Sequence, residues 1–148
     1  MLFIFLCLPV IALTQTVFQG LGFSIQPPSL QDMPDNQAIV IFYFPVSEKS
    51  APNVSVIKQT YADSTSRYKD LSETQLKEQK AEIISSKIVD GKYYIEYIWV
   101  VNGIKLHFYS KAILKNGKAV LATATATPGQ WRKFRNELIK TVESLSLL

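Results

Sequence analysis

Between residues 83 and 126, runs rich in Ile, Val, Tyr, Phe and Thr alternate with short turn signals. The signals are Asp90-Gly91, Asn102-Gly103 and Asn116-Gly117, and they suit type I′ turns because both central residues of such a turn need positive φ. Two-residue turns join antiparallel neighbours, so the pattern predicts a four-strand meander. Its strands are predicted near residues 83–89, 92–101, 104–114 and 118–126.

Two-residue turns also fix the register of the strands that they join. Val101 is therefore predicted to face Ile104, and Leu114 to face Ala119. One sheet face is then almost wholly apolar, and we expect it to lie against helices. Its members are Ile84, Ile88, Tyr93, Ile95, Tyr97, Trp99, Val101, Ile104, Leu106, Phe108, Leu114 and Leu121. The other face is mixed, and we expect it to be thinly covered or partly wet. Its members are Glu96, Ile98, Val100, Lys105, His107, Tyr109, Lys111, Val120 and Ala124.

A helical pattern follows the meander. The run Thr127-Pro128-Gly129-Gln130 offers an N-cap Thr, a Pro at the first helical position and a Gln at N3, which together form a capping box. Large apolar residues then recur at spacings of three and four from Trp131 to Leu145. The spacing predicts an amphipathic helix over 128–145 whose aromatic end packs on a sheet face.

The pattern upstream of the meander completes the fold prediction. Residues 38–44 form a continuous apolar run, which we interpret as a strand buried on both faces, and residues 54–61 alternate as its neighbour. A second capping box at Ser72 predicts a polar surface helix that ends near Ala81. The whole pattern predicts an α+β fold in which helices pack on a central antiparallel sheet of about six strands.

The N-terminus is a short apolar run, residues 1–13, followed by small and polar residues. We interpret residues 1–20 as a signal peptide or N-terminal anchor and residues 21–148 as one domain. The basic flank of a signal peptide is missing, because no Lys or Arg precedes Lys49. The alternatives are a start that lies further upstream, an uncleaved membrane tether through residues 1–23, lipidation at Cys7, and a buried strand or helix of the domain formed by residues 1–20. We favour export, which places the domain outside the cytoplasm, in the periplasm or the extracellular space.

Composition narrows the function classes. Sixteen Lys and Arg against twelve Asp and Glu give a net charge of +4, with no basic run of the kind that binds nucleic acid. We therefore expect no nucleic-acid partner. Cys7 is the single cysteine and lies in the N-terminal apolar run, so we expect neither an intramolecular disulfide nor thiol chemistry in the folded domain.

Candidate chemistry is sparse. His107 is the single histidine, and a lone His without a cysteine beside it does not make a typical metal site. Glu96 is the carboxylate inside a strand, and its predicted partner is Lys105 or Lys111. We predict no catalytic residue, no metal site and no cofactor. The best surface candidate for binding is a row on one strand, Lys105, His107, Tyr109 and Lys111, which could contact an anionic ligand.

The order of these elements resembles the PsbP/Mog1-like family of αβα sandwiches. The resemblance is carried by Phe23-Ser24-Ile25-Gln26-Pro27-Pro28, by Pro52-Asn53-Val54-Ser55-Val56, by the two Asn-Gly turns and by the terminal helix with its closing Ser-Leu, and it spans about residues 22–147. Members include extrinsic photosystem II subunits, a nuclear Ran-GTPase-binding protein and exported bacterial proteins, often lipoproteins. No residues known to carry those interactions match here, so none transfers.

The resemblance implies a fold and a class of role more than an activity. It favours an exported accessory protein that is not an enzyme and that binds or assembles with another envelope protein. The alternatives are a carrier of a small apolar or anionic ligand between sheet and helix, which needs a pocket of roughly 300 Å3, and a hydrolase that uses Glu96 or His107.

Overall fold

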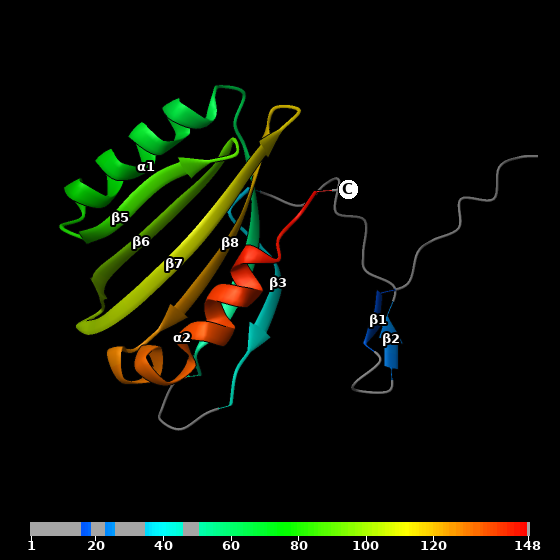
Figure 1. Ribbon diagram of the computed structural model, residues 1–148, viewed down its shortest axis with the longest axis vertical. Helices are drawn as coiled ribbons and strands as arrows, with labels where there is room; N and C mark the ends of the chain where they lie inside the picture. Colours follow the sequence, from blue (N-terminus) through cyan, green and yellow to red (C-terminus); the bar gives the residue numbers. More distant parts are fainter. Residues whose placement is uncertain (1–15, 19–22, 26–34, 46–50, 148) are drawn as a thin grey trace, which may run out of the picture. The chain divides into compact units, whose positions relative to one another are not determined.

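The computed structural model describes residues 16–18, 23–25, 35–45 and 51–147 (Figure 1). The chain divides into two compact units, Met1–Met33 and Pro34–Leu148. In the first unit, β1 (Thr16–Phe18) pairs antiparallel with β2 (Phe23–Ile25). Most of the predicted export segment lies outside the described residues, so the predicted boundary at residue 20 stays a prediction. No helix in the described ranges is long and apolar enough to cross a membrane.

The second unit is built on one antiparallel sheet of six strands in the order β3-β4-β8-β7-β6-β5. This confirms the predicted α+β fold. The strands are β3 (Ala38–Tyr43), β4 (Asn53–Thr60), β5 (Glu82–Val89), β6 (Lys92–Val101), β7 (Ile104–Lys115) and β8 (Lys118–Ala126). All six residues of the three predicted turns have positive φ, from 49° to 77°. The turn signals therefore placed the meander β5–β8 correctly.

The register of the meander is also as predicted, with one exception. Val101 faces Ile104 and Leu114 faces Ala119. In β5 a bulge between Ile83 and Ser85 shifts the pairing by one residue. Ile83 is thereby turned toward the core, and Ile84 is 48% exposed. The prediction that Ile84 joins the apolar face was wrong, because a bulge re-aims every side chain before it.

The helices lie on opposite faces of the sheet. Helix α1 (Thr65–Glu78) packs against β5 and β6, and helix α2 (Pro128–Glu143) packs against β7, β8 and β4 (Figure 1). The capping box at the start of α2 is confirmed by two reciprocal hydrogen bonds, from Thr127 N to Gln130 Oε1 at 3.0 Å and from Gln130 N to Thr127 Oγ1 at 3.4 Å. Because α1 and α2 lie on opposite faces of the sheet, the second unit is an αβα sandwich.

Helix α1 begins earlier than predicted. Its N-cap is Ser64, which accepts a hydrogen bond from Arg67 N. Ser72 lies in the middle of the helix and donates to the Tyr68 carbonyl, 2.8 Å away. A Ser followed three residues later by a Gln resembles a cap in sequence, but the same Ser in mid-helix can bond the preceding turn instead. The earlier start places Tyr68 in the core.

Strand β3 is not buried on both faces, which corrects the prediction for residues 38–44. It is an edge strand that pairs with β4 on one side, and no described strand pairs with its other side. Phe42 is 44% exposed and Tyr43 is 69% exposed. A continuous apolar run is common to buried strands and to unprotected edges, so periodicity does not separate the two.

The two cores differ in their side chains. Under α2, small residues of β8 make room for large residues of the helix, with Ala122 and Ala124 facing Leu138 and Val142. Under α1, the core is built on Tyr68, Tyr93 and Ile95. The mixed face was expected to be thinly covered. Helix α2 covers it over β7, β8 and β4, whereas Val100 on β6 remains 56% exposed.

Candidate functional site

The predicted binding row on β7 lies largely beneath helix α2. His107, Tyr109 and Lys111 are buried, with 9%, 8% and 3% of their surface exposed, and Lys105 is exposed. The row exists as predicted, but its three buried members have partners inside the fold. That these residues bind a ligand stays a prediction, and their geometry gives them a structural role.

His107 joins the sheet to α2. Its ring stacks on the Trp131 indole with ring centres 3.9 Å apart. Its Nε2 lies 2.8 Å from Glu96 Oε1. The predicted pairing of Glu96 with Lys105 or Lys111 was wrong, because His107 lies on the neighbouring strand within reach of the carboxylate and Lys111 is engaged elsewhere. Trp131 covers this pair from the helix side.

Tyr109 and Lys111 hold the C-terminal end of α2. The Tyr109 hydroxyl donates to Glu143 Oε1 at 2.9 Å. Lys111 Nζ donates to the carbonyls of Glu143 and Leu145, each at 2.6 Å. A cation at a helix C-terminus satisfies carbonyls that have no partner within the helix. Burial raises the pKa of Tyr109, with a further contribution from Glu143. Burial lowers the pKa of Lys111, as does Lys92 nearby.

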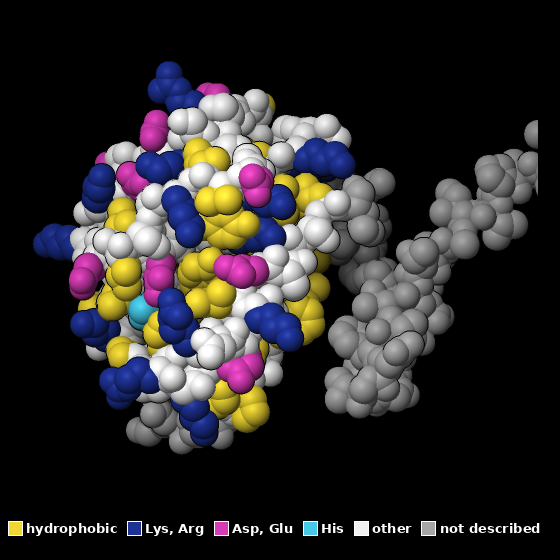
Figure 2. Space-filling view, viewed as in Figure 1, with side chains coloured by type: hydrophobic (Ala, Val, Ile, Leu, Met, Phe, Trp, Pro, Cys, Tyr) yellow, Lys and Arg dark blue, Asp and Glu magenta, His cyan; other side chains and the backbone are white. Residues whose placement is uncertain are grey.

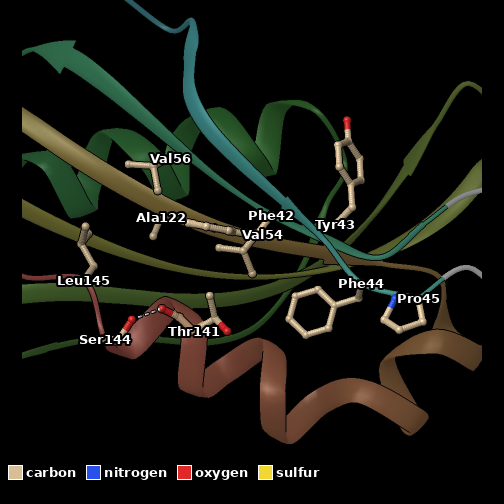
Figure 3. Close-up of a pocket in the computed structure, with 10 residues that line it drawn as sticks. All are labelled: Phe42, Tyr43, Phe44, Pro45, Val54, Val56, Ala122, Thr141, Ser144 and Leu145. Atoms are coloured by element: carbon tan, nitrogen blue, oxygen red, sulfur yellow. Dashed lines mark hydrogen bonds between the residues drawn. The ribbon is translucent and has the colours of Figure 1, made fainter. Parts of the chain in front are cut away.

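A groove of about 410 Å3 lies between β3 and the C-terminal half of α2 (Figure 3). Strands β3, β4 and β8 form its floor, and the last turns of α2 form its wall. The lining residues are Phe42, Tyr43, Phe44, Pro45, Val54, Val56, Ala122, Thr141, Ser144 and Leu145. None of them is charged, and most are apolar. The groove therefore suits an uncharged, apolar occupant.

Alternation along β3 decides which side chains enter the groove. Phe42 faces Val54 of β4, which belongs to the core under α2, and Tyr43 faces Asn53 on the other side of the sheet. Figure 3 shows Phe44 directed toward α2 and Tyr43 directed away from it. Phe44 also packs against Phe134 of α2, with ring centres 6.2 Å apart. The chain that follows β3 therefore helps to close one end of the groove.

The two edges of the sheet differ in protection. Edge strand β3 carries no charged residue and exposes Val40 and Ile41 as well as Phe42. Edge strand β5 carries Glu82 and Lys87 and packs against α1, whereas a register shift occurs in both edge strands, between Ile83 and Ser85 in β5 and between Ala38 and Val40 in β3. Charged residues on the strand and cover by a helix are among the devices by which proteins prevent unwanted pairing at sheet edges. By this criterion β5 is a protected edge and β3 is an open one.

The surface charge offers no comparable site on the face seen in Figure 2. Lys and Arg side chains there are spread among acidic and apolar ones instead of gathering into one patch. Hydrophobic side chains reach the surface along the side where Figure 1 places β3. No group of three or more His, Cys, Asp or Glu within the described ranges could hold a metal ion.

The sequence contained one signal for this groove. The uncharged run at residues 38–44 was identified as a strand, but its place in the sheet was not. The groove depends on β4 lying beside β8, a pairing between residues far apart in the chain. No local pattern reports such a pairing, so the groove could not be predicted from the motifs of β3 or α2 alone.

Comparison with known proteins supports the fold. No family model and no curated protein matches the chain. A Pseudomonas aeruginosa protein of unknown function, PA94, aligns over 91% of this chain and 96% of its own, at 16% identity and a TM-score of 0.62. LpqN, involved in cell envelope biogenesis of Mycobacterium tuberculosis, aligns over 71% of this chain and 67% of its own, at 14% identity and a TM-score of 0.50.

Cyanobacterial PsbP from Synechocystis aligns over 70% of this chain and 79% of its own, at 17% identity and a TM-score of 0.45, a likeness too weak to argue from. At 16% and 14% identity, the likenesses to PA94 and LpqN show a shared fold and no shared activity. Membership in the PsbP/Mog1-like family stays a prediction.

Proposed function

We propose that this protein is an exported, non-catalytic binding or assembly factor of the cell envelope that receives an extended apolar segment of a partner protein along β3. The observation that carries the proposal is the open edge of β3 beside an uncharged groove of about 410 Å3. An added strand gains main-chain hydrogen bonds at such an edge, and alternate side chains of the strand enter a neighbouring pocket.

The chemistry of the edge supports a protein segment as the occupant. The outer side of β3 has no described strand to satisfy its backbone N–H and C=O groups, and a peptide strand supplies both partners. On the groove side, Val40 and Phe42 would contact every second residue of the added strand. The partner segment is therefore expected to be extended and apolar at alternating positions.

The proposed envelope location is supported by the N-terminus and by the fold. The apolar N-terminal run favours export, and the fold is shared with LpqN, which takes part in envelope biogenesis in its own organism. Non-catalytic action is part of the proposal, since no motif in the sequence points to a reaction. Turnover of a substrate by the purified protein, abolished by changing one residue, would overturn it.

Peptide selection against the full chain tests the docking site. Displayed peptides that bind are expected to be extended and apolar at alternating positions, and their binding is expected to protect β3 amides from hydrogen exchange. Phe42→Lys should weaken the selected peptides about tenfold or more, because the lost burial of a large apolar side chain is worth about 1.5–3 kcal/mol.

The matched control is Val89→Lys on β5, an exposed apolar residue of the protected edge. It should leave peptide affinity within about twofold, because β5 does not border the groove. Equal losses in the two variants, or protection of β5 amides instead of β3 amides, would reject the β3 site.

A small apolar ligand is the second candidate. The groove volume falls within the range of about 300–1,000 Å3 that is typical of ligand pockets. Native mass spectrometry of the purified full chain separates the two candidates, because a retained small molecule would be seen as a discrete mass increment. Thr141→Trp, which would fill the groove from the α2 side, should remove that increment.

A further inference from the structure

Two hollows lie beside α1, on the face of the sheet opposite to the groove. The larger has a volume of about 220 Å3 and is bounded by α1, β4, β6, β7 and β8. Its lining residues are Gln59, Tyr68, Ser72, Gln75, Leu76, Gln79, Tyr93, Ile95, Tyr97, Trp99, Ser110 and Leu121. The smaller, of about 190 Å3, shares Gln59, Tyr68, Ser72 and Gln75 with it. The two hollows are therefore neighbours along the helix.

The lining of the larger hollow combines aromatic rings with uncharged polar groups. It contains three Gln amides, two Ser hydroxyls, three Tyr phenols and one indole, and no Lys, Arg, Asp or Glu. Burial raises the pKa values of Tyr68, Tyr93 and Tyr97 to about 12, so the phenols remain neutral at physiological pH. An anion or a cation would find no countercharge among these residues, and a purely apolar ligand would strip water from polar groups without replacing it.

Two side-chain amides at the rim of the larger hollow can make hydrogen bonds to a ligand. Gln75 lies in the last turn of α1 and Gln79 is its C-cap, and the side-chain amides of both make no hydrogen bond within the described part of the chain. Each amide offers both a donor and an acceptor. A ligand whose surface carries many hydroxyl groups, each both donor and acceptor, is complementary to such a rim.

The aromatic members are fixed in place. Trp99 Nε1 donates to the Gln79 carbonyl at 3.1 Å, which holds the indole at the end of the helix. Tyr97 stacks on Phe108 with ring centres 4.8 Å apart and planes within 8°. A ring that is already held in position gains contact with a ligand without losing further rotamer freedom. Such rings can contact the C–H faces of a flat ligand.

The smaller hollow continues the same chemistry and adds one carboxylate. Gln59 accepts a hydrogen bond from the Tyr68 hydroxyl and donates to Asn36 Oδ1 at 2.7 Å. Asp35 accepts from Thr60 N at 2.8 Å and from Thr60 Oγ1 at 3.3 Å, and the backbone bond is the main cause of its lowered pKa. Asp35 is therefore a fixed acceptor at the far end of the pair of hollows.

From this arrangement we propose that the α1 face is a binding site for a neutral carbohydrate, with one sugar ring in the larger hollow and the next directed toward the smaller one. At about 30 Å3 per water molecule, the larger hollow corresponds to about seven waters, roughly the volume of one sugar ring. The site rests on observations separate from those at β3, so neither proposal depends on the other.

The test is a titration of the full chain with neutral disaccharides, using maltose, cellobiose and diacetylchitobiose as probes and tryptophan fluorescence as the readout. Saturable binding of at least one probe is expected by about 10 mM, a concentration that populates even complexes near 4 kcal/mol. The emission change should disappear in Trp99→Phe, because Trp131 is a buried residue of α2 on the opposite face of the sheet.

Two helix variants separate a binding site from a structural cleft. Gln75→Ala keeps the helix, since Ala is the best helix former, and Gln79→Ala keeps the C-cap bond, which the Gln79 backbone N–H makes to the Gln75 carbonyl. Each variant should weaken sugar binding about fivefold or more. Glu78→Ala, between them in sequence and absent from both linings, should change affinity less than twofold. Saturation-transfer NMR on the same variants gives a readout that does not depend on fluorescence.

The proposal is overturned by any of three results: no saturable binding of the three probes, preference for uridine or inorganic phosphate over them, or unchanged sugar affinity in both Gln variants. Phe42→Lys at the β3 groove is expected to leave sugar binding intact. Its peptide defect and the sugar defects of the Gln variants therefore report on the two sites independently.

Discussion

The two faces of the sheet are covered by helices of similar length, but the packing under the two helices differs. Under α2 the contact is close and apolar, with alanines of β8 against Leu138 and Val142, both fully buried. Under α1 the contact is made through tyrosines, glutamines and serines and leaves two hollows. We infer that the contacts under α2 contribute most of the stability of the domain. The contacts under α1 are less closely packed and leave polar groups accessible.

The largest expected effect tests this division directly. Leu138→Ala removes a side chain with 0% exposure and should destabilise the fold by about 2–5 kcal/mol. Leu76→Ala, the matched change on α1, should cost less, about 1–2 kcal/mol, because Leu76 is half-buried beside a hollow. Urea denaturation of both variants gives the two free energies of unfolding. Equal losses in the free energy of unfolding would contradict the inference that the α2 face contributes more stability than the α1 face.

A smaller effect is expected at the end of α2. Lys111→Met removes the donor to the carbonyls of Glu143 and Leu145 and should cost about 1–3 kcal/mol, the range for leaving buried polar groups without partners. Lys105→Met, on the same strand but exposed, serves as the control and should stay within about 0.5 kcal/mol of the parent chain.

Thermal or urea unfolding measures both lysine variants. If Lys111→Met were as stable as the parent, Lys111 would not be needed to hold the helix end.

The smallest effect at neutral pH concerns the tyrosines under α1. Burial raises the folded-state pKa values of Tyr68, Tyr93 and Tyr97 to about 12, above the value of about 10 in an unfolded chain. Between these values the folded state holds protons that the unfolded state has released. The stabilisation is therefore complete below about pH 10 and is lost as the pH rises toward 12.

Free energies of unfolding measured across this alkaline window should fall, and the phenolate absorbance should rise together with unfolding. Tyr68→Phe should make the fall shallower, because one group with a raised pKa is gone. A fall of unchanged steepness would show that Tyr68 does not contribute to it. Tyr109 on the α2 face is also buried, so its replacement by Phe measures the contribution of the other face.

Much of the fold was accessible from local signals. The turns at Asn102-Gly103 and Asn116-Gly117 set the register of β6, β7 and β8, and Thr127 marked the start of α2, because each of these choices is made by residues adjacent in sequence. The start of α1 was missed because Ser64 and Ser72 both suit a cap, and the packing of Tyr68 favours the earlier one.

The candidate sites were harder to predict from the sequence than the fold. The row on β7 looked like surface because the alanines of β8, which admit α2, carry no strong pattern of their own. The groove beside β3 requires the pairing of β4 with β8, and the hollows beside α1 bring Gln59 of β4 close to Tyr68 of the helix. Both depend on contacts across the fold that no short stretch of sequence encodes.

The unequal edges of the sheet also set a limit on self-association. If two copies paired through β3, their sheets would merge into one, and the free ends of the merged sheet would both be β5. Those ends carry charged residues and lie beside α1, so a third copy would meet a protected edge. Association through β3 would therefore end at the dimer, whereas a fibre needs an open edge at each end of every subunit. The apolar edge that we propose as a docking strand would thus not lead to polymer growth.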